Sequence, residues 1–338
     1  MMIDIPAIRR ITAVLCALCA LSAVSPTSAA QAPRVVLAVD GIGQPRNLPV
    51  LVAERLGYFV DEGLIVTLVD SPASPTPGEL LKDGRADGAV AYFHHTFMSQ
   101  ADDHLVTQAV VAMGVAPGVK LLVASRLHDR VHTLADLKGL CVYTGGRNSG
   151  KTTTANWLVA RGGLTLHDYT ALALTTRSQM EHALQSGDAD AIVASTADAA
   201  RYVASGAAFV MADLSSADGT RRALGELYPS TTLYLPKTYV SAHPEIVQHL
   251  VNAQLRALTF IRSHDAEAIA AALPPAKDPT AYVRLLAEEK NMFDADGIMP
   301  AAGARDEWKT MAALQPKYAQ IDFGETFTDA FVQRSPRH

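Results

Sequence analysis

The sequence has few cysteines and no long apolar run after its first thirty residues, and both absences limit its class. Only three of its 338 residues are cysteine, and two of these, Cys16 and Cys19, lie close to the N-terminus. Cys141 is left alone in the rest of the chain, so no disulfide framework can form and core burial must supply the stability. No stretch after residue 30 is apolar enough to suggest a membrane-spanning helix.

Charged residues are also scarce, and neither sign dominates. The chain has 29 Lys and Arg against 34 Asp and Glu, for a formal net charge of −5. This balance argues against a nucleic-acid partner, which favours a basic chain. It does not argue against a small anionic ligand, because a few local donors can outweigh a mild global charge. The chain is long enough for two ordinary α/β lobes.

The first thirty residues are typical of a cleavable export signal. Arg9 and Arg10 precede the apolar run 11–24, and the small residues 28–30 follow it. We therefore predict that residues 1–30 are a signal peptide, that cleavage occurs before Gln31, and that the mature protein works in the periplasm. The net charge of the mature chain would then be −6, since one acid and two bases are removed.

Apolar strand patterns and helix patterns alternate through most of the mature chain. Such alternation predicts an α/β fold with mostly parallel sheets flanked by helices. After His243 the patterns are helical only, and the predicted helices are 244–263, 266–272, 280–291 and 301–313. The predicted strands are 34–39, 64–69, 89–92, 106–113, 120–124, 140–143, 171–174, 191–194, 208–211 and 231–235.

Three passages, in order along the chain, resemble one known family. They are Leu56–Leu64 (LGYFVDEGL), Leu134–Gly139 (LADLKG) followed by a strand and a glycine-rich loop, and Ala295–Pro300 (ADGIMP) before a helix. Together they resemble the solute-binding proteins of ABC importers for nitrate, sulfonates, taurine and pyrimidine precursors. Taken alone, the glycines and aromatic residues of these passages are folding signals that end helices and allow turns.

The resemblance implies the type II periplasmic-binding-protein fold, with two lobes that close around a solute. The first lobe would comprise residues 33–117 plus 236–338, and the second residues 118–235. The solute would lie between them, which agrees with the rule that open α/β sheets bind ligands beyond the carboxyl ends of their strands. The implied partners are an ABC permease and its cytoplasmic ATPase, and the implied oligomeric state is a monomer.

The segment Gly145–Thr152 matches the nucleotide-binding pattern G-x-x-x-x-G-K-[ST], follows a predicted strand and opens a predicted helix. A nucleotide-binding enzyme is therefore an alternative. Against it stand the export signal and the lack of an apolar strand that ends in an aspartate for magnesium. A glycine-rich loop at a helix N-terminus suits any anion. We expect it to contact the solute, with Arg147 as a charged donor, unless Ser149 merely caps the helix and Arg147 faces solvent.

Other polar residues near strand ends are candidate ligand contacts. The loop 40–47 follows the first strand, and the pair His94–His95 follows the third; no further histidine stands at metal-binding spacing, so we expect hydrogen bonding and no metal. Tyr234 could stack on a planar ligand or pack near the hinge, and the serines and threonines could contact ligand or cap helices. The full predicted set is Gln44, Arg46, Asn47, Ser74, His94, His95, Thr96, Gly146, Arg147, Asn148, Ser149, Thr152, Ser195, Thr196 and Tyr234.

Nothing in the sequence indicates catalysis. No nucleophile-elbow motif is present, and Cys141 lies in an apolar strand, where a thiol is usually inert. We therefore expect a non-enzymatic protein without cofactor that binds a small organic anion, with a sulfonate as first choice and an aromatic carboxylate or a pyrimidine or vitamin precursor as alternative. A cytosolic pyrimidine-precursor synthase would share the two-lobe frame, and the export signal points away from it.

Overall fold

The computed structural model describes residues 32–72, 74–144, 149–172, 177–293 and 296–336. The predicted signal peptide and the residues Gly146, Arg147 and Asn148 lie outside these ranges. No helix within the described ranges is long and apolar enough to span a bilayer.

Ten strands form two five-stranded sheets among the described residues, ordered β2-β1-β3-β10-β4 and β7-β6-β8-β5-β9. All ten occur where the sequence predicted them, with ends that move by at most three residues. Their bounds are β1 Arg34–Val39, β2 Ile65–Asp70, β3 Gly88–Tyr92, β4 Thr107–Ala112, β5 Val119–Ala124, β6 Cys141–Tyr143, β7 Thr170–Leu172, β8 Ala191–Ser195, β9 Ala208–Leu214 and β10 Thr231–Pro236.

Each sheet has one strand that runs against the other four. In the first sheet this strand is β10, which pairs antiparallel with β3 and β4; in the second it is β5, which pairs antiparallel with β8 and β9. Both are the first strand after the chain crosses from the other sheet. The predicted lobe boundary after residue 235 therefore falls inside β10, which belongs entirely to the first sheet.

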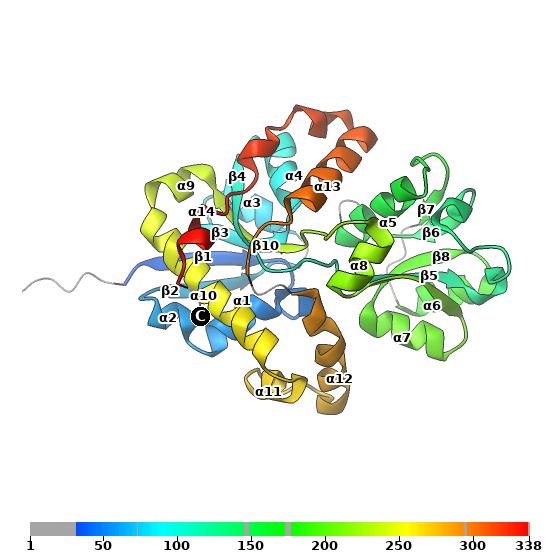
Figure 1. Ribbon diagram of the computed structural model, residues 1–338, viewed down its shortest axis with the longest axis horizontal. Coiled ribbons are helices and arrows are strands. Elements are labelled where there is room, and N and C mark those ends of the chain that lie inside the picture. The colour runs from blue at the N-terminus through cyan, green and yellow to red at the C-terminus, as the bar shows by residue number, and fades with distance from the viewer. Residues whose placement is uncertain (1–31, 73, 145–148, 173–176, 294–295, 337–338) are drawn as a thin grey trace, which may run out of the picture. The chain divides into compact units, whose positions relative to one another are not determined.

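Helices cover both faces of both sheets, and Figure 1 shows this layering. We call each sheet with its helices the first and the second lobe. The helix bounds are α1 Leu48–Arg55, α2 Tyr58–Asp61, α3 Pro77–Lys82, α4 His95–Asp102, α5 Gly150–Arg161, α6 Arg177–Ser186, α7 Thr196–Ala204, α8 Ala217–Leu224, α9 Lys237–Ala242, α10 Pro244–Ser263, α11 Ala266–Ala271, α12 Pro279–Glu289, α13 Ala301–Leu314 and α14 Ala330–Arg334.

Alternate side chains of each strand enter different cores, as the two-residue period of a strand requires. In β1, Val35, Leu37 and Val39 pack with α1 and α10, whereas Ala38 faces α3, α4 and α13. The second sheet packs α5 and α8 on one face and α6 and α7 on the other. Both lobes are therefore three-layered, which confirms the predicted α/β class.

Two crossing segments connect the lobes and are hydrogen bonded to each other. The amides of Met113 and Gly114 both donate to the Thr231 carbonyl, and the amide of Tyr228 donates to the Val115 carbonyl at 3.0 Å. The amide of Val115 in turn donates to the Met292 carbonyl at 2.8 Å, just after α12. These pairings make residues 113–118 and 228–231 a narrow connection between the lobes.

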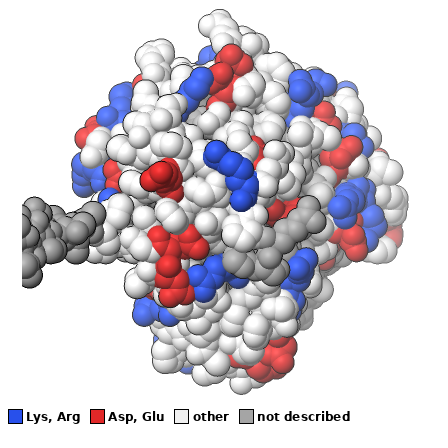
Figure 2. Space-filling view, turned by 60° about the vertical axis from the view of Figure 1, so that its left-hand side comes forward, with Lys and Arg blue, Asp and Glu red and all other residues white. Residues whose placement is uncertain are grey.

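Charges of both signs are interspersed on the surface. Figure 2 shows basic and acidic side chains alternating over the face that it presents. Several of them form exposed ion pairs, such as Lys317 with Asp102 and Arg256 with Asp61. Pairs of this kind contribute little to stability, so the fold depends on its cores.

Because Gly303 has no side chain, α13 lies against Leu227, which directly precedes the crossing segment 228–231. This contact is testable. A Cβ on Gly303 would lie 1.7 Å from the Leu227 carbonyl oxygen. We expect Gly303→Ala to lower the free energy of unfolding by about 1–3 kcal/mol, although alanine normally favours a helix by ~1 kcal/mol. Urea unfolding measures the change.

The matched control is Gly43→Ala, because a Cβ there has nothing within 4 Å. Its effect should stay within about 0.5 kcal/mol. A Gly303→Ala variant as stable as the parent would show that α13 does not press on the crossing segment.

Candidate functional site

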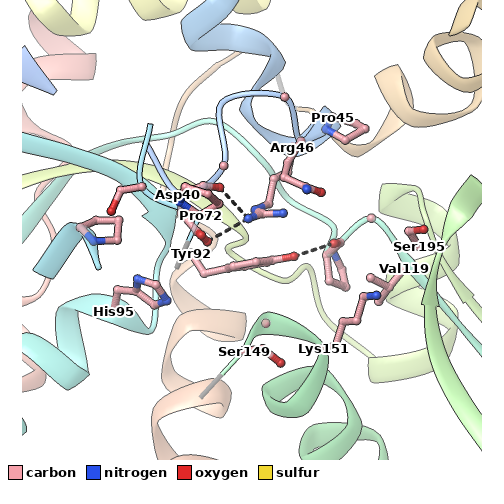
Figure 3. Close-up of a pocket in the computed structure, with 18 of the residues that line it drawn as sticks. Asp40, Pro45, Arg46, Pro72, Tyr92, His95, Val119, Ser149, Lys151 and Ser195 are labelled. Atoms are coloured by element: carbon pink, nitrogen blue, oxygen red, sulfur yellow. Dashed lines mark hydrogen bonds and ion pairs between the residues drawn. The ribbon is translucent and has the colours of Figure 1, made fainter. Parts of the chain in front are cut away.

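A cavity of about 860 Å³ lies between the two sheets and takes its walls from both lobes. Its lining begins where strands end: Asp40 follows β1, Ser71 follows β2, Tyr92 closes β3, and Tyr143 and Ser195 close β6 and β8. This is the position at which open α/β sheets bind ligands, because loops and helix starts gather there. The cavity is the candidate site, and Figure 3 shows its centre.

Three helices of eight or more residues begin at the cavity, namely α4, α5 and α7. Each directs the positive end of its dipole toward that space. At α4 the amides of Thr96 and Phe97 already donate to the carbonyls of Phe93 and His94. The start of α5 is capped by Ser149, whose hydroxyl accepts from the Thr152 amide at 3.2 Å. Ser195 caps α7 in the same way, from the Asp198 amide. Both serines therefore cap helices while they line the cavity.

Tyr92 crosses from the first lobe to the second at the centre of the site (Figure 3). Its ring packs on the start of α5 so closely that a Cβ on Gly150 would lie 2.3 Å from it. Its hydroxyl donates to the Pro117 carbonyl at 3.3 Å. The Arg46 guanidinium lies over the ring at 5.0 Å from its centroid, a cation–π contact. Burial raises the pKa of Tyr92, so the phenol stays protonated.

Arg46 is the charged residue that the sequence predicted in the first loop, and its charge is partly compensated. One guanidinium nitrogen donates to the Asp40 carboxylate at 2.9 Å and to the Asp40 carbonyl at 2.7 Å. Asn47 holds the same loop, because its amide donates to the carbonyls of Asp40 and Gly41, both at 2.8 Å. Asn47 is completely buried and does not line the cavity. It shapes the loop in place of contacting a ligand there.

The two histidines differ in surroundings. His95 lines the cavity. Burial is the main cause that lowers its pKa well below 6.5, and the nearby His94 and Arg46 lower the pKa further. The neutral ring has one donor and one acceptor nitrogen. His94 is completely buried and does not line the cavity. Its Nδ1 atom lies 3.2 Å from Oε1 of Glu307, and the same oxygen accepts a hydrogen bond from the Tyr228 hydroxyl at 2.6 Å. His94 therefore serves a buried polar cluster near the crossing segments.

The structure brings together a third of the predicted contacts. The predicted residues that line the cavity are Gln44, Arg46, His95, Ser149 and Ser195. Gly146, Arg147 and Asn148 lie outside the described residues, so their predicted contacts stay predictions. The predicted residues that are described and do not line it are Asn47, Ser74, His94, Thr96, Thr152, Thr196 and Tyr234.

These seven have other surroundings. The Thr96 hydroxyl donates to the Phe93 carbonyl at 2.9 Å, and the Thr152 hydroxyl donates to the Thr144 carbonyl at 3.2 Å. Thr196 is buried, Tyr234 is completely buried in the core beneath the first sheet, and Ser74 is exposed. The side chains of Thr96, Thr152 and Thr196 therefore point to nearby backbone or into the protein. Their positions in the sequence did not indicate these directions.

One wall of the cavity comes from α12 and the turn after it, which the sequence did not predict to contribute. Tyr282, Leu285, Glu289 and Met292 all line the cavity. Burial, and then the neighbouring Glu288, raise the pKa of Glu289 to about 8. A signal was present, because Tyr282, Leu286 and Glu289 recur at spacings of four and three, which places the carboxyl on the apolar stripe of the helix.

The lining residues show no assembled catalytic or metal centre. Among the described residues, no three His, Cys, Asp or Glu side chains gather as they would around a metal ion. No serine, threonine or cysteine hydrogen bond to His95 occurs in the described part of the chain, so no nucleophile–base pair is formed there. Helix starts, hydroxyls and charges of both signs suit reversible binding of a polar solute.

Comparison with known proteins places this geometry in a family. The family model described as NMT1/THI5 like matches residues 44–268. No curated protein matches the sequence. A solved structure from Bordetella bronchiseptica RB50 is 28% identical, covers 89% of this chain and 96% of its own, and superposes with a TM-score of 0.73.

Two more distant structures share the fold. The alkanesulfonate-binding protein SsuA from Xanthomonas axonopodis pv. citri, bound to MOPS, is 19% identical, with a TM-score of 0.63 and coverage of 89% of this chain and 99% of its own. The desulfurization enzyme DszB is 14% identical, with a TM-score of 0.60 and coverage of 89% and 98%. At these identities the likeness concerns the fold alone. The resemblance that the sequence suggested is confirmed, and the chain belongs to the NMT1/THI5-like family and has the fold of the periplasmic binding proteins.

Proposed function

We propose that this protein is the solute-binding component of an ABC importer and captures a small organic anion in the cavity between its lobes. The observation that carries the proposal is the cavity itself, which has a volume of about 860 Å³ and is lined from both lobes. It lies beside a narrow double connection, through which the lobes could open and close as rigid bodies. Export to the periplasm, delivery to a permease with a cytoplasmic ATPase, and action as a monomer are parts of the same proposal.

The anionic group of the solute would lie at the start of α5. Free N–H groups and the dipole of this twelve-residue helix favour a negative charge there. Lys151 lines the cavity one residue further along, and His95 can donate from the first lobe. A micromolar affinity corresponds to about 8 kcal/mol. Charge-assisted hydrogen bonds contribute roughly 1.5–3 kcal/mol each, so a few of them are sufficient.

A sulfonate is the first choice for that anionic group, because three oxygens can accept from several donors at once. The SsuA protein with the same fold is named as an alkanesulfonate-binding protein. An aromatic carboxylate or a pyrimidine or vitamin precursor is the second choice, since the rings of Tyr92, Tyr143 and Tyr282 line the cavity and offer flat surfaces. An enzymatic role is disfavoured because no nucleophile hydrogen bonded to His95 is found among the described residues.

A ligand screen tests the class of solute. Residues 31–338 would be purified and melted with sulfonates, carboxylates, phosphonates, pyrimidines and Mg-ATP. We expect a concentration-dependent rise in Tm with one class of organic anion and none with Mg-ATP, because only a ligand of the native state stabilises it. Stabilisation by Mg-ATP followed by phosphate release would instead identify Gly145–Thr152 as a nucleotide-binding loop.

A variant of Lys151 tests where the anion binds. Lys151→Ala should weaken binding of the best anion about tenfold or more, since a charge-assisted hydrogen bond contributes roughly 1.5–3 kcal/mol. The Tm of the empty protein should change little. Titration calorimetry measures the affinity. The control is Lys309→Ala, which removes an exposed lysine outside the cavity and should leave the affinity unchanged. Equal affinities for both variants would remove Lys151 from the site.

A further inference from the structure

The cavity holds a buried carboxyl group that an anion receptor does not need. Glu289 lines the cavity from the last position of α12, and only 3% of the residue is exposed. Its Oε2 atom is buried without a hydrogen-bond partner. The Thr196 hydroxyl lies close enough to act as a donor that lowers the pKa of Glu289, but it does not reach the geometry of a hydrogen bond. Buried carboxyls without a partner are costly, so one that faces a binding cavity calls for an explanation.

No ion pair with this carboxyl occurs within the described ranges, although the charge of nearby Lys120 lowers its pKa as the smallest of the causes. The elements packed against α12 include α7, α11 and the turn Pro45–Asn47. Arg46 in that turn is paired with Asp40, and Arg201 in α7 with Glu181. Lys120 in β5 is paired with Glu288 and, at 3.1 Å, with Asp213. Lys290 donates to the His264 carbonyl. The acids around it, Glu288, Asp198 and Glu267, supply no compensation.

The apolar neighbours of Glu289 shape a small subsite. Leu285, Tyr282 and Met292 line the same wall, and Met292 also packs on the crossing segment at Gly118. The other charged lining residues are Asp40, Arg46, Asp103 and Lys151, of which Asp40 and Arg46 neutralise each other. The positive end of the α5 dipole, with Lys151 in its first turn, and the Glu289 carboxyl at the end of α12 therefore line the same cavity.

We infer that Glu289 is a specificity-determining residue that selects solutes carrying a protonated amine in addition to their anionic group. This inference rests on the proposed function and narrows it from organic anions to zwitterions. The ammonium would supply the donor and the positive charge that Glu289 lacks, in a place where water is largely excluded and the pair is strong. An anion without an amine would leave the carboxyl buried and unpaired, which is the usual basis of strong discrimination.

The affinity test uses pairs of probes that differ only in the amine. These are 2-aminoethanesulfonate with ethanesulfonate, 2-aminoethylphosphonate with ethylphosphonate, and 3-aminopropanoate with propanoate. Calorimetry at pH 7 in two buffers of different ionisation enthalpy, neither of them a sulfonate, gives the affinity and the proton balance. We expect the amine to improve affinity at least tenfold for the preferred anionic group, and binding to release close to one proton, because Glu289 must ionise to pair with it.

The matched variants are Glu289→Gln and Glu288→Gln. Glu288 is the adjacent residue, but its side chain is 42% exposed and pairs with Lys120 outside the cavity. Glu289→Gln should reduce the preference for the amine to less than about threefold and abolish proton release, while still binding the anion. Glu288→Gln should keep both. If the anions bind without preference and without proton release, this inference is overturned and the proposed function stands. If no probe binds, the proposed function fails as well.

A second readout needs no ligand. The pKa of Glu289 rises from 4.5 to about 8 on folding, so between these values the folded state holds more protons than the unfolded state and stability falls as pH rises. Glu289→Gln removes this dependence. Its Tm relative to the parent should therefore rise between pH 5 and pH 8 and level off above about 8. A constant difference in Tm would show that no buried, protonated carboxyl exists there and would overturn the inference.

Discussion

The contact between the Tyr92 ring and Gly150 is the constraint on which the site depends. Tyr92 ends a strand of the first sheet, yet its ring belongs to the apolar core of the second lobe. A Cβ on residue 150 would lie 2.3 Å from that ring, so the contact requires glycine. Because both residues also line the cavity, the surface that joins the lobes is continuous with the surface that would meet a solute. In the proposed hinged receptor, closure and binding would thereby be one event.

Several buried polar groups lie at this boundary between the lobes. The strands and helices on either side pack apolar cores, whereas the boundary holds His94, Glu307 and Tyr228 as a fully buried cluster. The second oxygen of Glu307 and the second nitrogen of His94 have no partner. Buried ionisable clusters seldom stabilise a fold better than apolar residues of the same volume would. Their position beside the crossing segments is consistent with the proposed hinge.

The sequence predicted the elements better than the directions of their side chains. All ten strands follow from local apolar runs, and the pattern is strongest in central strands such as β3, where every residue is buried. The cavity residues Gln44, Arg46, His95, Ser149 and Ser195 follow from one rule, that strand ends of an α/β sheet face the ligand. The order of the strands could be expected only from the family resemblance, since pairing across more than a hundred residues leaves no local pattern. The place of β10 inside the first sheet differs from the lobe boundary predicted after residue 235.

The predicted residues that do not line the cavity, and the lining residue that was not predicted, have physical causes at single positions. Asn47 and Thr96 stand in loops and helix starts that face the cavity, but each uses its side chain to satisfy nearby backbone carbonyls, and that choice depends on local dihedral angles. Glu289 was overlooked because two adjacent glutamates near the end of a helix are typical of a solvated face. Only the stripe through Tyr282 and Leu286 distinguishes it from Glu288.

Glu288 and Glu289 show how one helix can contact the other lobe and also line the cavity. Consecutive residues of a helix point about 100° apart, so when Glu288 pairs with Lys120 on β5, Glu289 is turned toward the cavity. The ion pair is partly exposed and adds little stability by itself, although it links a first-lobe helix to a second-lobe strand. The rotation of α12 is held by Leu286, which is buried in the core of the first lobe. The orientation of the buried carboxyl is thus set by the packing of its own helix, and helix α7 of the second lobe packs beside it. Any selectivity that Glu289 provides would therefore be complete only when the lobes are closed.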